Sequence, residues 1–393
     1  WVVRGGDKLA DKLNYVCLHD SAPIKQEREA IKFDKVYELE DDLEMVRARI
    51  EQDLWQHGDS TRWRIATACY LIDALCLRVG DEKDPDEADT VGATTLRPEH
   101  VTLHEDGLAE FRFLGKDSIL WHKKLHVPDV VHENLAELIR TARPSSNSGN
   151  GDRSHPTRDK PQLFPNCSSR DVNAYLSHVL PGLTAKVFRT HHATMAVRRC
   201  LQESGVVAED PDHKKWEAAN LANLEAAILC NHTKQEPATW AGSRKRYQER
   251  QEKSKERVDK VRAQVRGYRE ELSALRAEAR RQEEEARPEA ARKVRARYKK
   301  RLEVARARVT KGEEQLEKAQ LALGKIKVQA AIAAKKRTWN LVTSLKSYID
   351  PRVYHAWGEA VGYDVLERYY PTALRRKFAW VKAENGQEEQ SEA

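Results

Sequence analysis

The chain has 393 residues, with 69 Lys and Arg against 62 Asp and Glu, and a formal net charge of +7. This length allows two or three domains, or one domain with an extended element. No apolar run approaches the roughly 18 residues of a membrane-spanning helix, and no GxxxxGK[ST] or GxGxxG loop occurs, which argues against a transmembrane helix and against a nucleotide-driven reaction.

Six cysteines are scattered along the chain without CxxC spacing. This pattern predicts a reduced intracellular protein with neither a disulfide framework nor a zinc site. The sequence begins at Trp1 and enters directly into Val2 and Val3. We therefore expect a fragment whose N-terminal part is missing.

The positive charge is concentrated in one stretch. Residues 241–340 contain 31 Lys and Arg against 15 Asp and Glu, a net of +16, so the rest of the chain carries −9. A basic segment attached to a mildly acidic body predicts a polyanion as partner.

The first expected elements are helices. Residues 1 to about 24 read as the end of an earlier domain. From Glu27 to Leu54, apolar residues recur at helical spacing among charges, which predicts an exposed amphipathic helix. Residues Thr61–Val79 predict a buried helix with Gly80 at its C′ position, so that Arg78 lies in the last turn.

The pattern then changes to strands. Alternating residues within Val101–Val127 surround Gly115, which predicts a β-hairpin or a small antiparallel sheet with Lys116 at the tip. Residues 143–161 are rich in Pro, Ser, Gly and Asn, typical of a surface loop. Three further helices are expected: Val172–Leu180, Thr190–Glu203 and His213–Leu229.

The basic stretch carries two heptad runs. From Val258 to Leu275, apolar residues are spaced 3, 4, 3, 4, 3, and a similar rhythm returns from Tyr298 to Ile326. Pro288 separates the runs, so we expect an antiparallel helical hairpin. At 1.5 Å per residue, each arm would be about 50 Å long. The tail from Glu384 is acidic and predicts disorder.

Five residues could together cut and rejoin a phosphodiester: Arg78, Lys116, Arg189, His232 and Tyr348. A tyrosine nucleophile stores the bond energy in a phosphotyrosine, so resealing needs no ATP. Two arginines can hold the nonbridging oxygens, while a lysine and a histidine can donate protons or hydrogen bonds. The set needs no metal. Taken singly, each residue also has an ordinary structural explanation, such as a helix-end cation or a core histidine.

These residues stand in local sequences that match a known family together and in order. The segments are Leu75–Lys83 with Ala88–Gly92, Phe113–Ser118, Leu183–Thr190, Ala227–His232, Ser344–Arg352 and Arg376–Trp380. From about Ile24 to Trp380 the chain resembles the eukaryotic-type DNA topoisomerase IB family. The resemblance implies a mainly α fold with a small antiparallel β-sheet (α+β), comprising a topoisomerase IB/tyrosine-recombinase-like catalytic core and an antiparallel coiled-coil linker.

The resemblance also implies roles. Tyr348 is expected to form a 3′-phosphotyrosyl link, with Arg78, Arg189 and His232 stabilising the pentacoordinate phosphate. Lys116 is expected to protonate the departing 5′ oxygen. Strand rotation and religation then relax supercoils without a cofactor. DNA contacts near the cleavage site are expected from Lys186 and Asp117.

By the same resemblance, residues 1–24 are the remnant of an N-terminal cap and 25–238 the catalytic core. Residues 239–338 form the linker, and 339–393 the C-terminal domain. The expected partner is double-stranded DNA, bound by a monomer with no membrane association, with the cap needed to complete the clamp. The expected location is nuclear in a eukaryote, or the cytoplasm and nucleoid in an archaeon.

Two other functions remain open at this stage. A tyrosine recombinase shares the chemistry, but usually has a His three residues before the second arginine, where this chain has Lys186, and lacks a long coiled-coil insertion. A non-catalytic DNA-binding coiled-coil protein would account for the basic arm but not for the five motifs. Ser347 stands where eukaryotic members of the family usually have Asn, which predicts reduced sensitivity to camptothecin-type inhibitors.

Overall fold

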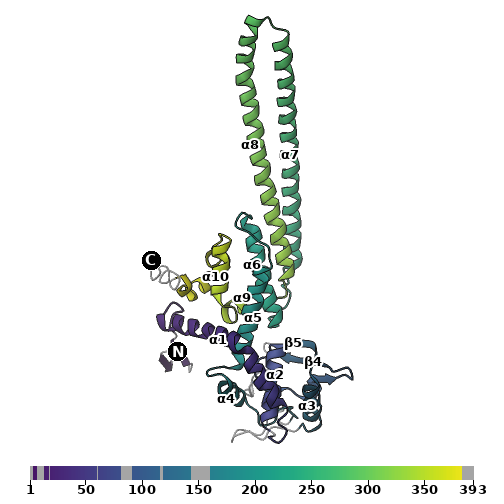
Figure 1. Cartoon of the computed structure of the whole chain (residues 1–393), viewed down its shortest axis with the longest axis vertical. Helices are drawn as coiled ribbons and strands as arrows, with labels where there is room; N and C mark the ends of the chain where they lie inside the picture. Colours follow the sequence, from purple (N-terminus) through teal and green to yellow (C-terminus); the bar gives the residue numbers. More distant parts are fainter. Residues whose placement is uncertain are drawn as a thin grey trace. The chain divides into compact units, whose positions relative to one another are not determined.

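The computed structural model describes residues 3–6, 13–16, 18–59, 61–80, 91–115, 118–142 and 160–382. The chain forms two compact units, one of residues 1–208, 218–234 and 339–393, the other of residues 209–217 and 235–338. The fold is mainly helical with a small antiparallel sheet, which confirms the expected class (Figure 1). Lys116 and Asp117 lie outside the described residues.

Helices make up most of the first unit. Its longer helices are α1 (Pro23–Leu54), α2 (Arg62–Leu75), α3 (Asp129–Arg140), α4 (Ser169–Val179) and α5 (Ala185–Gln202). Four short helices follow near the C-terminus, namely α9 (Leu341–Ser347), α10 (Pro351–Ala360), α11 (Val365–Arg368) and α12 (Thr372–Lys377). Helix α6 (Asp212–Leu229) has residues in both units.

Helix α1 differs from the exposed helix expected from the sequence, because its apolar stripe is buried. Phe33, Val36 and Leu39 are fully covered, and Val46 and Ile50 continue the stripe against the neighbouring helices α2 and α5. The charged residues occupy the opposite face. An apolar stripe of this length needs a packing partner, which the local pattern alone does not reveal.

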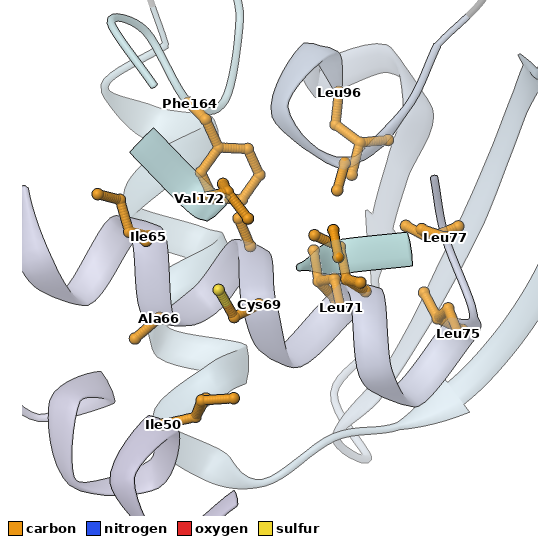
Figure 2. Packing of buried hydrophobic residues seen from close by; sticks show 14 of the residues in the cluster. Ile50, Ile65, Ala66, Cys69, Leu71, Leu75, Leu77, Leu96, Phe164 and Val172 are labelled. Atoms are coloured by element: carbon orange, nitrogen blue, oxygen red, sulfur yellow. The ribbon is translucent and has the colours of Figure 1, made fainter. Parts of the chain in front are cut away.

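Helix α2 is buried as predicted but ends earlier than expected. It stops at Leu75, where Cys76 takes a left-handed conformation with φ of 55°. Arg78 therefore lies in the extended segment beyond the helix, not in its last turn, and Gly80 is not the C′ residue. Figure 2 shows Leu71 and Leu75 of α2 in the core, with Leu77 just past the helix end.

The predicted hairpin is confirmed as part of a three-stranded antiparallel sheet of order β3-β4-β5. The strands are β3 (Val101–Leu103), β4 (Leu108–Gly115) and β5 (Ile119–His126), preceded by short 3-10 helices at Ala93–Thr95 and Pro98–His100. Phe113 lies opposite Trp121, and Gly115 opposite Ile119 at the tip. A separate antiparallel pair joins β1 (Val3–Gly6) and β2 (Leu13–Val16).

The second unit contains the predicted helical hairpin. Helices α7 (Trp240–Glu284) and α8 (Pro288–Lys335) run antiparallel, side by side (Figure 1). Every seventh seam residue is buried, at Val258, Val265 and Leu272 in α7 and at Tyr298, Ala305, Gly312 and Ala319 in α8. This spacing is that of a coiled coil.

Within the described ranges, no helix combines the length and apolarity needed to cross a bilayer.

Candidate active site

Tyr348 follows directly after α9 and is held by backbone contacts. Its N–H donates to the Ser344 carbonyl at 2.9 Å, and its own carbonyl accepts from Thr194 Oγ1 at 3.3 Å. The Asp350 N–H donates to the same Thr194 oxygen at 3.1 Å. Thr194 belongs to α5, so this helix fixes the backbone of the tyrosine.

Arg78 donates from Nη1 to the Tyr348 hydroxyl oxygen at 2.8 Å. Its segment pairs with the chain beyond residue 90, because Ala93 N donates to Arg78 O at 2.9 Å and Thr94 N to Val79 O at 2.8 Å. The close approach of Gly92 to this segment requires the absence of a side chain there. Arg78 is therefore positioned by strand-like pairing.

Arg189 lies in the second turn of α5 and is only 2% exposed, so the structure excludes a plain surface role for it. Its guanidinium donates to the carbonyls of Cys76 and Cys230, the latter at 3.1 Å. These two carbonyls direct its Cζ to 5.0 Å from the Tyr348 ring. Its Nε has no hydrogen-bond partner among the described residues.

His232 lies three residues beyond the end of α6, after Asn231 with φ of 54°. Its Nδ1 is 2.8 Å from Ser344 Oγ, and its ring centroid is 5.2 Å from that of Tyr348. Burial, followed by the charges of Arg189 and Arg78, lowers the pKa of His232 to about 3. The imidazole is therefore neutral near pH 7, and its Nε2 has no partner within the described part of the chain.

A cavity adjoins these side chains. Its lining residues come from the Arg78 segment, the Gly92 segment, the inner face of the β4–β5 hairpin, the chain after α6 and the start of α9: Leu77, Arg78, Val91, Gly92, Phe113, Gly115, Ile119, Trp121, Cys230, Asn231, His232, Thr233, Asn340 and Thr343. Gly115, which directly precedes Lys116 in the sequence, pairs with Ile119 at the end of the two strands. Lys186 is exposed in the first turn of α5 and is not among the lining residues.

The structure thus brings Arg78, Arg189 and His232 around Tyr348, although the first and last of the four are 270 positions apart in sequence. Two arginines and a neutral histidine around one phenol suit an anionic group with several acceptor oxygens, such as a phosphate.

Several residues that support the site have roles that the sequence motifs did not predict. Thr194 holds the Tyr348 backbone, Ser344 holds His232, and fully buried Asp350 is paired with Arg352 at 2.9 Å. Ser344 and Asp350 lie inside the Tyr348 motif, which was the available signal for them. Thr194 lies outside every motif considered, and only the tertiary structure identifies it.

Two family models match the chain. The catalytic core of eukaryotic DNA topoisomerase I matches residues 21–265, and the C-terminal topoisomerase domain matches residues 320–388. The first model covers more than half of the 393 residues.

Curated relatives match nearly the whole chain. A human protein named DNA topoisomerase I, mitochondrial, is 31% identical over 394 residues, covering 99% of this chain and 58% of the relative. Human DNA topoisomerase 1 is 31% identical over 97% of this chain and 45% of the relative. The Drosophila melanogaster DNA topoisomerase 1 is 30% identical over 97% of this chain and 34% of the relative. The chain therefore spans between about a third and three fifths of these proteins.

Proposed function

The chain belongs to the eukaryotic DNA topoisomerase I family, and from this membership we propose that it carries the catalytic centre of a type IB DNA topoisomerase. The reaction is relaxation of supercoiled DNA by transient cleavage of one strand, rotation and religation. The observation that carries the proposal is the convergence of Arg78, Arg189 and His232 on the hydroxyl and ring of buried Tyr348.

In the proposed cleavage step, Tyr348 Oη attacks the scissile phosphorus. A bond forms between Oη and phosphorus as the bond to the 5′ oxygen breaks, which leaves a 3′-phosphotyrosine. The phenol gives its proton to water, and the 5′ oxygen takes one from Lys116, the general acid implied by the family resemblance. Religation is the same step reversed, so the energy of the phosphodiester is retained.

Arg78, Arg189 and His232 supply the electrostatic part of this mechanism. Arg78 already donates to Oη at 2.8 Å, so its guanidinium is placed to reach an oxygen on the phosphorus that Oη attacks. Arg189 is held by two carbonyls and needs no reorganisation when charge develops. Neutral His232 can donate from Nε2 when Nδ1 accepts from the Ser344 hydroxyl.

The proposed partner is double-stranded DNA, bound by a monomeric enzyme. The core of residues 25–238 and the C-terminal segment 339–393 would form the catalytic centre, and the linker 239–338 would add basic surface near DNA. Lys186 and Asp117 remain proposed DNA contacts. The proposed location is the nucleus, and the mitochondrial relative makes that organelle the second compartment to examine.

The test is plasmid relaxation by the natural full-length protein in EDTA without ATP, comparing wild type with Tyr348→Phe. We expect wild type to relax both positive and negative supercoils, and the variant to bind DNA without relaxing it. Binding without relaxation by the wild-type protein would favour a DNA-binding scaffold. Exchange of strands between two duplexes would favour a tyrosine recombinase.

A further inference from the structure

Trp121 of strand β5 has an indole N–H for which the residues that the structure describes supply no acceptor. The side chain is 6% exposed and stacks on Phe113 across the strand pair, with centroids 6.2 Å apart and planes 11° from parallel. Its Nε1 has no hydrogen-bond partner among the residues that the structure describes. The same side chain lines the cavity that Arg78 and His232 also line.

A buried donor without an acceptor destabilises a folded protein by about 1–3 kcal/mol. Phenylalanine would stack equally well on Phe113 and would avoid this cost. When such a donor lies at the wall of a binding cavity, a ligand that supplies the acceptor explains why the donor is left unpaired in the free protein. His232 lines the same cavity, and its Nε2 is likewise buried without a hydrogen-bond partner among the described residues.

Lys123 keeps the indole in place. Its Nζ lies 4.9 Å from the centroid of the Trp121 ring and donates to the Leu229 carbonyl at 3.2 Å. Leu229 is the last residue of α6, three positions before His232. The ring is therefore held by contacts with Phe113 and Lys123. The Lys123–Leu229 hydrogen bond ties its strand to the segment that carries His232. Such preorganisation is what a donor needs to act in a transition state.

We propose that Trp121 Nε1–H donates a hydrogen bond to a nonbridging oxygen of the scissile phosphate, as a donor additional to Arg78, Arg189 and His232. This inference rests on the function proposed above. The indole adds a donor without adding charge beside two arginines, and it cannot lose its proton at any physiological pH.

The test measures single-turnover strand cleavage of a duplex oligonucleotide at saturating full-length protein. Trp121→Phe keeps a stacking ring and removes the donor, and we expect cleavage to slow by about 100-fold, at the lower end of what loss of one preorganised donor costs. Trp121→Tyr has the same ring as the Phe variant plus a hydroxyl donor, and we expect it to be faster than Trp121→Phe.

Trp380→Phe is the matched control. Its Nε1 is likewise buried without a partner among the described residues, but Trp380 does not line the cavity. The replacement should leave the cleavage rate within about twofold of wild type, because Trp380 is buried outside the cavity and its loss removes no contact to the phosphate.

Sulfur substitution separates contact from packing. Each nonbridging oxygen of the scissile phosphate is replaced in turn by sulfur, a weaker acceptor. The wild type should be slowed more by the isomer whose sulfur faces the indole, and Trp121→Phe should lose that extra slowing for this isomer only. A purely structural role would slow the oxygen and both sulfur substrates by the same factor.

The inference would be overturned if Trp121→Phe cleaved at the wild-type rate. It would also be overturned if sulfur substitution slowed the variant and the wild type equally for both isomers. Either result would leave the proposed function intact. If the wild-type protein forms no covalent adduct with DNA, the proposed function fails and the inference fails with it.

Discussion

At the scale of single residues, the contact between Ser344 and His232 decides which imidazole nitrogen carries the proton. If Ser344 Oγ donates to Nδ1 across their 2.8 Å contact, the proton lies on Nε2, the nitrogen left without a partner among the described residues. Ser344 is fully buried, so a water molecule does not easily take the place of its hydroxyl as the partner of Nδ1. It acts as a positioning residue for the histidine.

We predict that Ser344→Ala slows strand cleavage by about 2- to 10-fold, the worth of one neutral hydrogen bond, with unchanged DNA affinity. Ser204→Ala is the control, because the contacts of that hydroxyl are local: it donates to the Leu201 carbonyl and accepts from the Val206 N–H at 3.4 Å. A residue that acts through His232 has no effect once His232 is gone. A double variant Ser344→Ala/His232→Ala that cleaves more slowly than His232→Ala alone would therefore contradict this prediction.

The low pKa of His232 predicts a pH dependence of stability. The pKa is lowered to about 3 in the fold, while an unfolded histidine titrates near 6.5, so the unfolded state binds more protons between these values. Stability contributed by neutral His232 is present above about pH 6.5 and is lost as pH falls toward 3, by up to about 1.4 kcal/mol per pH unit.

Urea unfolding between pH 4.5 and 7 tests this, with His232→Gln expected to show a shallower decline than wild type. The cleavage rate should show no ionisation assignable to His232 between pH 5 and 8. An NMR titration of the His232 ring in the folded protein with a midpoint near 6.5 would refute the account.

At the scale of elements, the pairing of the Gly80 and Gly92 segments places Arg78. A Cβ on Gly92 would lie 2.4 Å from Gly80 Cα and 2.9 Å from the Arg78 carbonyl oxygen, both backbone atoms. We predict that Gly92→Ala displaces Arg78 and slows cleavage at least about tenfold, since misplacing a reacting group by 1 Å can cost 10²-fold.

The control for this variant is Gly58→Ala, where the added methyl meets nothing within 4 Å. Both variants should bind DNA comparably, so that the difference lies in the chemical step. Equal cleavage rates for Gly92→Ala and wild type would show that the segment tolerates the methyl without moving Arg78.

The helical hairpin has its own test at Gly312. An added Cβ there would lie 3.0 Å from Val265 Cγ2 and 3.3 Å from Tyr268 Cδ2, within the α7–α8 seam. Gly312→Leu should destabilise the hairpin by about 1–3 kcal/mol through overpacking, whereas Gly267→Leu, with open space around it, should not. Limited proteolysis within residues 240–335 measures the difference, and equal protection of the two variants would contradict the predicted seam.

Periodicity predicted the elements well where the pattern was long. The α7–α8 hairpin, the buried face of α2 and the β4–β5 pair were all visible in the sequence. The end of α2 was not, because Cys76 adopts a left-handed conformation that is usual for glycine and that its neighbours alone do not predict. Helices α9, α11 and α12, with 7, 4 and 6 residues, are too short for a periodic signal.

At the scale of the whole molecule, the site joins residues that local patterns cannot connect. Arg78 and Tyr348 meet across 270 positions, and only the family resemblance predicted that they act together. Thr194 and Trp121 escaped prediction because their roles depend on which polar atoms the complete fold leaves paired or unpaired. The sequence therefore indicates the proposed reacting groups, and the tertiary structure shows which residues hold them in place.

The charge distribution predicts how salt acts on the protein. Residues 241–340 carry a net +16, so phosphate contacts there should release counterions. Removing residues 245–335 should weaken DNA binding at low salt and flatten its dependence on salt concentration. An unchanged salt slope after this deletion would mean that the basic hairpin does not touch DNA.

The role of Tyr348 is tested most directly by identifying the residue that becomes covalently attached to DNA. The natural full-length protein is reacted with a nicked duplex oligonucleotide, so that the short fragment with the 5′-hydroxyl released by cleavage diffuses away and religation is prevented. The adduct is then digested, and the DNA-linked peptide is sequenced by mass spectrometry. We expect one DNA-linked peptide, with the 3′-phosphate on Tyr348, and no adduct from Tyr348→Phe. Attachment at another residue, or through the 5′-phosphate, would contradict it.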